Sequence, residues 1–406
     1  MVPPSRSLED FTDLVSLAEV NQRDDPQTYA RLRGRWGEVA PVELVPGIPV
    51  WLVMGYQEII QVSRDERLFS RDSRHWRYLG KLQGSGSPLA LMMTPQEHSH
   101  FADGEKHRRL RAPLDDGLEG LDEHRTSRAT QAICLGLIAK FADRREADLV
   151  TEYAALVPML AVASWFGIGT DDAGRLMEAM ASLFVPGQDP RPGMEIMQQI
   201  LSGLILAHQE DPVDDLTTAL LRHPNYHDAS EVTQAIVQLL AAGQEATVAW
   251  IAQTLRLILA DSHLGGRLRG GRLGVEEALD EVLWRRPPAA NIANRYALAD
   301  CEIAGTRIRK GDALAVSYAA ANTDPRVHGD DPWLEIGNRA HLAWGAGPHV
   351  CPAQRPSRTI VRIAVETVLT RLHDLRLAVP AEEISTAPSI STVCPAGLPV
   401  RFTGFS

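Results

Sequence analysis

Helical periodicity runs through the middle of the chain, from about residue 119 to residue 260, and it limits the possible folds more than any other feature. Apolar residues recur there three and four positions apart, which places them on one face of an α-helix. The last third differs, because DCEIAGTRIRKGDALAVSY alternates apolar and polar residues around Gly305 and Gly311, as short antiparallel strands do. Helical spacing then returns in RTIVRIAVETVLTRL. The sequence therefore predicts a mainly α protein with small β-sheets (α+β), in which a large helical body carries a smaller β-rich portion.

The composition is that of a folded protein with a substantial core. Hydrophobic residues make up 44% of the 406 residues and charged residues 23%, a balance that disordered chains lack. No internal repeat, low-complexity segment or evident linker divides the sequence. We therefore expect a single domain over residues 1–406.

Charge and hydropathy argue against two classes of partner. The formal net charge of −11 is the opposite of the basic footprint that nucleic-acid binding needs. The start of the chain, MVPPSRSLEDFTDLVSLAEV, carries acidic residues and lacks a basic region followed by an apolar run, and the apolar stretch AALVPMLAVASWFGIG contains Pro158 and is too short to cross a bilayer. We expect no nucleic-acid partner, no membrane partner and a cytoplasmic location.

One cysteine has neighbours that suggest chemistry. The four cysteines lie far apart without a CxxC pair, which indicates neither a zinc site nor a disulfide framework: Cys134, Cys301, Cys351 and Cys394. Cys351 alone follows a turn rich in glycine and precedes a predicted helix, whose free N–H groups and dipole favour a negatively charged sulfur. Such a thiolate can serve as a nucleophile or as the one protein ligand of a metal carried in another scaffold, such as haem. A buried turn cysteine without chemistry is the third interpretation of this stretch taken alone.

The stretch HLAWGAGPHVCPAQRPSR resembles the haem-binding signature of the cytochrome P450 family, FxxGxHxCxG, and the resemblance extends over nearly the whole chain. Trp344 replaces the usual Phe and Ala353 replaces the final Gly. The matching residues are Gly345, Gly347, His349 and Cys351. The resemblance implies that the Cys351 thiolate is the proximal ligand of the iron of haem b. It also implies that Trp344 packs on the sulfur side of the ring and that Ala353 adds one methyl group near the haem face.

A second resemblance lies in the nearly all-apolar segment LLAAGQEATVAWIAQTLRLILA. A carboxylate such as Glu245 is costly there unless it is solvated, paired or functional. The segment is similar to the oxygen-side helix of the family, AGxE/DT, with Ala242, Gly243 and Glu245 matching. Ala246 occupies the usual alcohol position and Thr247 follows one residue later, turned by about 100° on a helix. The resemblance implies an oxygen-binding groove, with proton delivery left to Glu245, ordered water or a substrate hydroxyl.

Basic residues form a third resemblance. In DGEKHRRLRAPL, His107 and Arg111 lie four apart on one helical face, which taken alone is typical of a solvated basic surface. In this context the pair resembles the HxxxR motif that binds haem propionates. The resemblance implies two further propionate partners, Arg295 and His349. The two histidines of EHSH, at positions 98 and 100, lack a convincing third ligand and are predicted to be loop residues.

The sequence departs from the family at the ExxR motif. The family normally has ExxR on a helix before the segment that corresponds to PPAANIANR, and its two charges pair with a further arginine. Here the text is DEVLWRRPP, so Glu281 is present and Trp284 replaces the arginine. An unpaired buried Glu281 would cost several kcal/mol. Two residues are candidates to compensate, Arg285 and Arg339.

The resemblance implies a soluble bacterial haem-thiolate monooxygenase that inserts one oxygen atom of dioxygen into a hydrophobic small molecule. No GxGxxG follows a strand, so the electrons are expected from a separate ferredoxin or flavodoxin with its reductase. Peroxide-driven oxidation, a non-oxygenating rearrangement and a haem-binding sensor or regulatory partner with little turnover remain open alternatives. The electron donor is expected on a basic patch formed by Arg108, Arg109, Arg355, Arg358 and Arg362.

Overall fold

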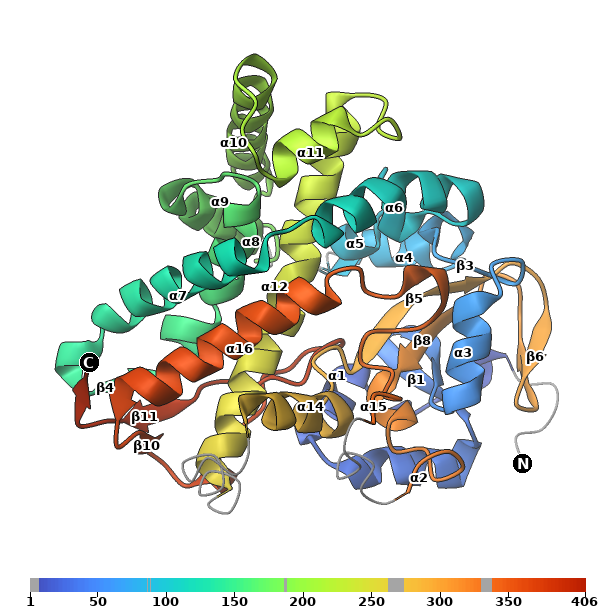
Figure 1. Ribbon diagram of the computed structural model, residues 1–406. Coiled ribbons are helices and arrows are strands. Elements are labelled where there is room, and N and C mark those ends of the chain that lie inside the picture. Colours follow the sequence, from blue (N-terminus) through green and yellow to red (C-terminus); the bar gives the residue numbers. More distant parts are fainter. Residues whose placement is uncertain (1–6, 86, 88, 186–187, 262–273, 330–337) are drawn as a thin grey trace.

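The computed structural model describes residues 7–85, 87, 89–185, 188–261, 274–329 and 338–406. A large helical body lies beside a smaller β-rich portion (Figure 1), so the predicted mainly α architecture with small sheets is confirmed. The helices before the centre of the chain are α1 (Leu17–Arg23), α2 (Pro26–Trp36), α3 (Tyr56–Arg64), α4 (Leu79–Gln83), α5 (Leu89–Met93), α6 (Gly104–Glu119), α7 (Glu123–Ala139), α8 (Val157–Trp165) and α9 (Thr170–Ser182). The later helices are α10 (Arg191–Glu210), α11 (Leu216–Arg222), α12 (Ala229–Ala260), α14 (Val275–Arg285), α15 (Tyr318–Ala321) and α16 (Gln354–Arg371).

Four small sheets complete the described structure. The largest has five strands in the order β1 (Val39–Val45), β2 (Ile48–Val53), β8 (Ala313–Ser317), β5 (Asn291–Ala297) and β3 (Phe69–Ser70). A three-stranded sheet has the order β10 (Arg376–Leu377), β11 (Pro399–Arg401) and β4 (Glu146–Asp148). Two pairs complete the set, β6 (Cys301–Ile303) with β7 (Thr306–Ile308) and β12 (Gly404–Phe405) with β9 (Leu372–His373). All the pairings are antiparallel except β2 with β8 in the largest sheet.

Local sequence patterns account for the β-rich portion. The alternating stretch after residue 300 forms the hairpin β6–β7 and then β8, as predicted. Gly305 and Gly311 have φ angles of +80° and +84°, which side chains other than glycine rarely adopt, so both turns depend on glycine. These turns return the chain to the five-stranded sheet, where β5 carries Arg295 toward the candidate site.

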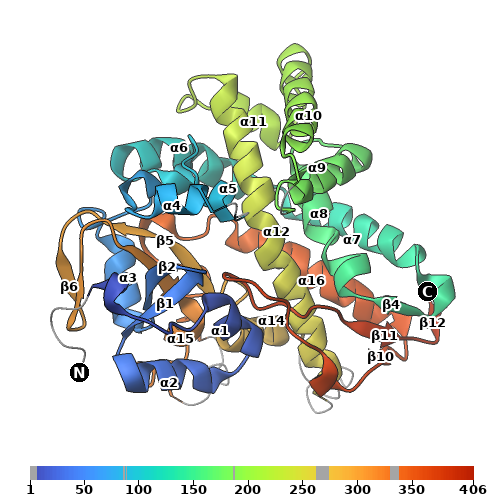
Figure 2. The same ribbon diagram turned by 180° about the vertical axis from the view of Figure 1, so that it is seen from behind.

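The long helix α12 organises the helical body. It runs through the centre of the molecule in both views (Figures 1 and 2). The Asp228 side chain caps its first turn by accepting a hydrogen bond from the Glu231 N–H at 3.1 Å. By length and composition alone α12 could cross a bilayer, yet half of its most apolar window is buried inside the protein. The core helix of a globular protein has the same character.

Candidate active site

The turn before Cys351 is built from backbone geometry. Gly345 and Gly347 have φ angles of +80° and +71°, and a Cβ atom on Gly347 would collide with the carbonyl oxygen of Ser63. The Cys351 N–H donates to the Trp344 carbonyl at 2.9 Å, which closes the turn. Side chains at the two glycines would therefore disrupt the loop that presents the cysteine.

The surroundings of Cys351 suit a sulfur that is bound to a cation. Burial is the largest influence and raises the pKa of the Cys351 thiol, while the Ala353 N–H and the charge of Arg111 act in the opposite direction. The sequence predicted that the amino end of the following helix would favour a negatively charged sulfur. In the structure α16 begins only at Gln354, and burial has the larger effect on the pKa of the thiol. A thiolate at this position is best stabilised by direct bonding to a metal ion.

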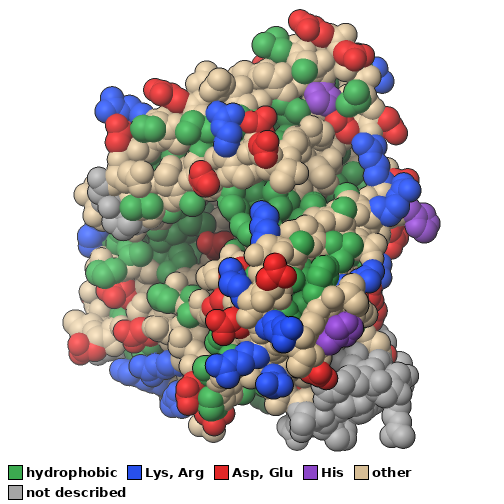
Figure 3. Space-filling model, turned by 90° about the vertical axis from the view of Figure 1, so that its left-hand side faces the viewer, with side chains coloured by type: hydrophobic (Ala, Val, Ile, Leu, Met, Phe, Trp, Pro, Cys, Tyr) green, Lys and Arg blue, Asp and Glu red, His purple; other side chains and the backbone are tan. Residues whose placement is uncertain are grey.

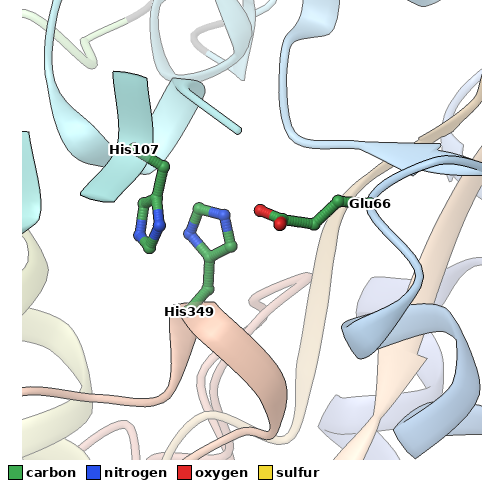
Figure 4. Close-up of side chains that lie close together, drawn as sticks. All are labelled: Glu66, His107 and His349. Carbon is green, nitrogen blue, oxygen red and sulfur yellow. The ribbon is translucent and has the colours of Figure 1, made fainter. Parts of the chain in front are cut away.

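Two histidines and a glutamate meet beside this turn. His107 on α6 and His349 in the cysteine loop lie with ring centroids 4.0 Å apart, and Glu66 points toward them (Figure 4). The Arg111 side chain donates to the Val350 carbonyl at 2.6 Å and to Asp115 at 2.7 Å, so it ties α6 to the cysteine loop. The structure thus brings His107, Arg111 and His349 together from segments more than 230 residues apart.

Unpartnered basic groups gather in the same place. Arg71 and Arg295 are 8% and 6% exposed, and neither forms an ion pair with a carboxylate among the described residues. Both ring nitrogens of His107, Nε2 of His349 and Nε of Arg71 lack a hydrogen-bond partner within the described structure. Burial, reinforced by the charge of Arg295, lowers the pKa of Arg71 to about 9. Buried donors and cations of this kind need an anionic ligand, and the two carboxylates of haem b fit that need.

The oxygen-side helix presents one open face. Ala242 and Glu245 are exposed in the middle of α12, whereas Thr247 is only 6% exposed. Ala246 is half-buried, and Gly243 packs beside Val162 without a close approach that would require glycine. The Ser391 hydroxyl lies 3.4 Å from the Glu245 carboxylate. Figure 3 shows a hollow on one side of the molecule that is lined largely by hydrophobic side chains.

Comparisons with known proteins agree with this geometry. The chain is 28% identical to 2-hydroxy-5-methyl-1-naphthoate 7-hydroxylase of Streptomyces carzinostaticus, over 92% of this chain and 94% of the relative. It is 29% identical to cytochrome P450 monooxygenase PikC of Streptomyces venezuelae, over 96% of this chain and 94% of the relative. The structure of the myxobacterial cytochrome P450 CYP267B1 in complex with myristic acid superposes with a TM-score of 0.82 at 28% identity, covering 95% of this chain and 98% of that one. No model of a protein family matches the sequence.

The chain is a cytochrome P450. Its cofactor is haem b, and it is an oxidoreductase of the monooxygenase class. The structure of CYP154C4 from Streptomyces sp. ATCC 11861, described as testerone bound, has the same fold with a TM-score of 0.83 at 25% identity, over 97% of this chain and 99% of that one. The monooxygenase relatives favour an enzyme over the haem-binding sensor that the sequence left open.

The missing ExxR arginine of this P450 is replaced by aromatic packing. Trp284 is 1% exposed, and its Nε1 donates to the Asn338 carbonyl at 3.2 Å. Its ring meets His328 and His341 edge to face, with centroids 4.9 and 5.4 Å apart. An indole therefore fills the space and links α14 to the segment before the cysteine loop.

Glu281 forms an ion pair with a residue of its own helix, α14. Arg285 lies one turn later and its guanidinium is 2.5 Å from the Glu281 carboxylate. Arg339, the other candidate, pairs with Asp280. Of the two candidates predicted from the sequence, Arg285 therefore compensates the charge of Glu281, as an ordinary i,i+4 ion pair.

Trp344 is held from the α12 side. Its ring lies edge to face with Trp250, with centroids 5.3 Å apart, and Trp250 donates through Nε1 to the Leu279 carbonyl at 3.1 Å. Arg358 covers the other indole, with its guanidinium carbon 5.6 Å from the Trp250 centroid. These contacts connect the cysteine loop to α12 and α14.

Sequence reasoning missed two residues of the basic cluster. His100 was predicted to be a loop histidine, but it lies in the short 3-10 helix Ser99–Phe101, and its half-buried ring contacts both Arg71 and Asn294. Arg71 had no role from the sequence, because it follows the two-residue strand β3 in an unremarkable charged stretch. The local sequence carries no signal that marks Arg71 as a buried cation.

Proposed function

We propose that this P450 inserts one oxygen atom of dioxygen into a hydrophobic small molecule, using electrons from a separate ferredoxin or flavodoxin and its reductase in the cytoplasm. The observation that carries the proposal is the pair of buried arginines beside the Cys351 turn, Arg71 and Arg295, which form no ion pair with any described carboxylate. The hydrophobic lining of the hollow in Figure 3 supports an apolar substrate. The relatives named above include a naphthoate hydroxylase and a structure with bound myristic acid, which agree with that class.

The proposed roles follow from position. Cys351 provides the thiolate ligand, and the Gly345–Gly347 turn allows the backbone to approach the ring closely. Arg295, His107 and His349 face the haem carboxylates, while Arg111 holds the cysteine loop through Val350. When bound, haem b supplies a thiolate-ligated iron at which dioxygen is activated. Trp344 and Ala353 are proposed to pack against the sulfur side of the ring.

Protons are proposed to arrive through Glu245. Its carboxylate is exposed on the open face of α12, so it can take a proton from water and pass it on through ordered water. Ala242 and Gly243 are proposed to line the oxygen-binding groove with small residues. Thr247 faces into the protein instead, as its burial shows. Ala246 therefore leaves the usual alcohol position of α12 without a hydroxyl.

The coupling of electron use to product should depend on position 246. Ala246→Thr is expected to raise the amount of product formed per nicotinamide cofactor consumed, because it adds a hydroxyl next to Glu245. Thr247→Ala should change this ratio little. Both ratios are measured with a surrogate ferredoxin system. Hydrogen peroxide release is measured as well, because it reports the electrons that do not lead to product. A large loss in Thr247→Ala without a gain in Ala246→Thr would show that Thr247 is the working alcohol.

The proposed docking surface is smaller than the sequence suggested. Three of the five arginines are engaged by acidic partners: Arg109 with Glu231, Arg358 with Glu276 and Asp280, and Arg362 with Glu276 and Glu366. Arg108 is exposed, and the side chain of Arg355 is 63% exposed with its nearest carboxylate, Glu123, 3.8 Å away. We therefore centre the site for an acidic donor on Arg108 and Arg355.

Reversing these two charges tests the surface. The double variant Arg108→Glu, Arg355→Glu should slow reduction of the iron by an acidic ferredoxin at least about ten-fold at low salt. Added salt should shrink the difference because it screens the charges. Haem content should stay unchanged, and Arg191→Glu on α10 provides a control at an exposed position. An unchanged reduction rate in the double variant would exclude this face.

A hydrophobic ligand screen tests the substrate class. Apolar molecules of moderate size should shift the Soret band as they displace water from the iron, and hydrophilic analogues of similar size should not. Turnover of the best ligands with a surrogate ferredoxin system then tests oxygen insertion. Ligand-induced shifts confined to polar or charged molecules would refute the proposed substrate class.

A further inference from the structure

The guanidinium of Arg71 is enclosed by protein, and no described residue neutralises its charge. Arg71 follows β3, and its backbone N–H donates to both carboxylate oxygens of Asp103 at 3.0 Å. Asp103 also accepts from the Ser70 hydroxyl. The nearby carboxylate is therefore occupied by the backbone and by Ser70, and it forms no ion pair with the Arg71 side chain.

The polar contacts of the guanidinium are with neutral groups. Arg71 Nη1 lies 3.5 Å from the Asn294 carbonyl, Nη2 lies 3.3 Å from Nδ1 of His100, and Nε has no hydrogen-bond partner in the part of the chain that the structure describes. Arg295 donates to the same Asn294 carbonyl at 3.2 Å. Two buried guanidinium groups thus converge on one carbonyl oxygen. Such an arrangement is unfavourable unless an anion joins it.

His100 is suited to aim this guanidinium. Burial and the neighbouring arginines hold the pKa of His100 well below its ordinary value, so the ring is neutral. Arginine can only donate, so Nδ1 accepts from Arg71 and Nε2 carries the hydrogen. The Asn294 side-chain amide is the partner of Nε2, with Nδ2 on that side; turning the amide by 180° puts its oxygen there as the acceptor, and amide orientation is assigned from the network. Asn294, His100 and Arg71 thus form a directed chain.

We propose that Arg71 is an additional guanidinium for a haem carboxylate, aimed by the ring of His100. The inference rests on the haem site proposed above and adds a residue that neither the HxxxR motif nor the cysteine signature contains. The haem carboxylates would then neutralise the positive charges of both Arg71 and Arg295. Arg71 binds the carboxylate, and His100 is a positioning residue that acts through Arg71.

Reconstitution with two porphyrins tests the contact directly. The wild type and Arg71→Gln are loaded with haem b or with its dimethyl ester, and porphyrin transfer to excess apomyoglobin is timed. With haem b, Arg71→Gln should release the porphyrin about ten-fold faster or more, the size expected for one lost hydrogen bond to a charged group. With the ester, which has no carboxylate charge, the two proteins should release it at similar rates.

Further variants separate binding from structural damage. Arg71→Lys keeps the charge and should restore part of the retention, and Arg74→Gln, at an exposed arginine nearby, should have no effect. His100→Phe should accelerate release of haem b, and adding it to Arg71→Gln should change the rate no further. The reduction potential should fall in Arg71→Gln with haem b but not with the ester. Equal acceleration for both porphyrins, or none for haem b, would overturn the proposal while leaving Cys351 ligation intact.

Discussion

Cys351→Ala should abolish the red-shifted Soret band of the reduced, carbon-monoxide-bound protein completely. That band reports a thiolate on the iron, and the alanine side chain has no atom that can replace the sulfur. Absorption spectra of the reduced protein with and without carbon monoxide measure the effect.

Another cysteine provides the matched control. Cys394 is half-buried, and burial raises the pKa of its thiol to about 12, so it is not available as a thiolate. Cys394→Ala should keep the full band. If Cys351→Ala kept the band, or Cys394→Ala lost it, the assignment of the proximal ligand would be wrong.

Trp284→Arg should destabilise the protein although it restores the sequence motif of the family. Glu281 is already paired with Arg285, and the pocket of Trp284 is walled by the rings of His328 and His341. A guanidinium there would lose the packing of a buried indole, worth about 3–5 kcal/mol, and would add the cost of a buried charge. Denaturant unfolding and haem content measure the effect.

Two further variants divide the contribution of Trp284. Trp284→Ala should cost about 3–5 kcal/mol from the cavity alone. Trp284→Phe keeps an aromatic ring and loses the hydrogen bond to Asn338, so it should cost less, on the order of 1 kcal/mol for the bond plus the smaller volume. A Trp284→Arg protein as stable as the wild type, in which Arg285→Ala became harmless, would show that Glu281 can re-form the family ion pair.

The local parts of the site followed from the sequence. The glycines before Cys351, the helix after it and the rotation of Thr247 away from Glu245 depend on backbone conformation and helical periodicity, which neighbouring residues determine. The strand and hairpin patterns near Gly305 and Gly311 were predictable for the same reason. Family resemblance added the ligand roles, and these concern residues within short motifs.

The contacts between distant segments were decided only by the tertiary structure. Arg71, His100 and Arg295 meet because β3, the turn before α6 and β5 converge, and nothing in their local sequence distinguishes buried cations from solvated ones. Acidic residues on other elements likewise neutralise most of the expected basic patch, and two histidines from outside α14 enclose Trp284. A local sequence carries secondary-structure preference, whereas the partner of a charge or ring depends on which elements pack together, so these interactions appeared only in the folded chain.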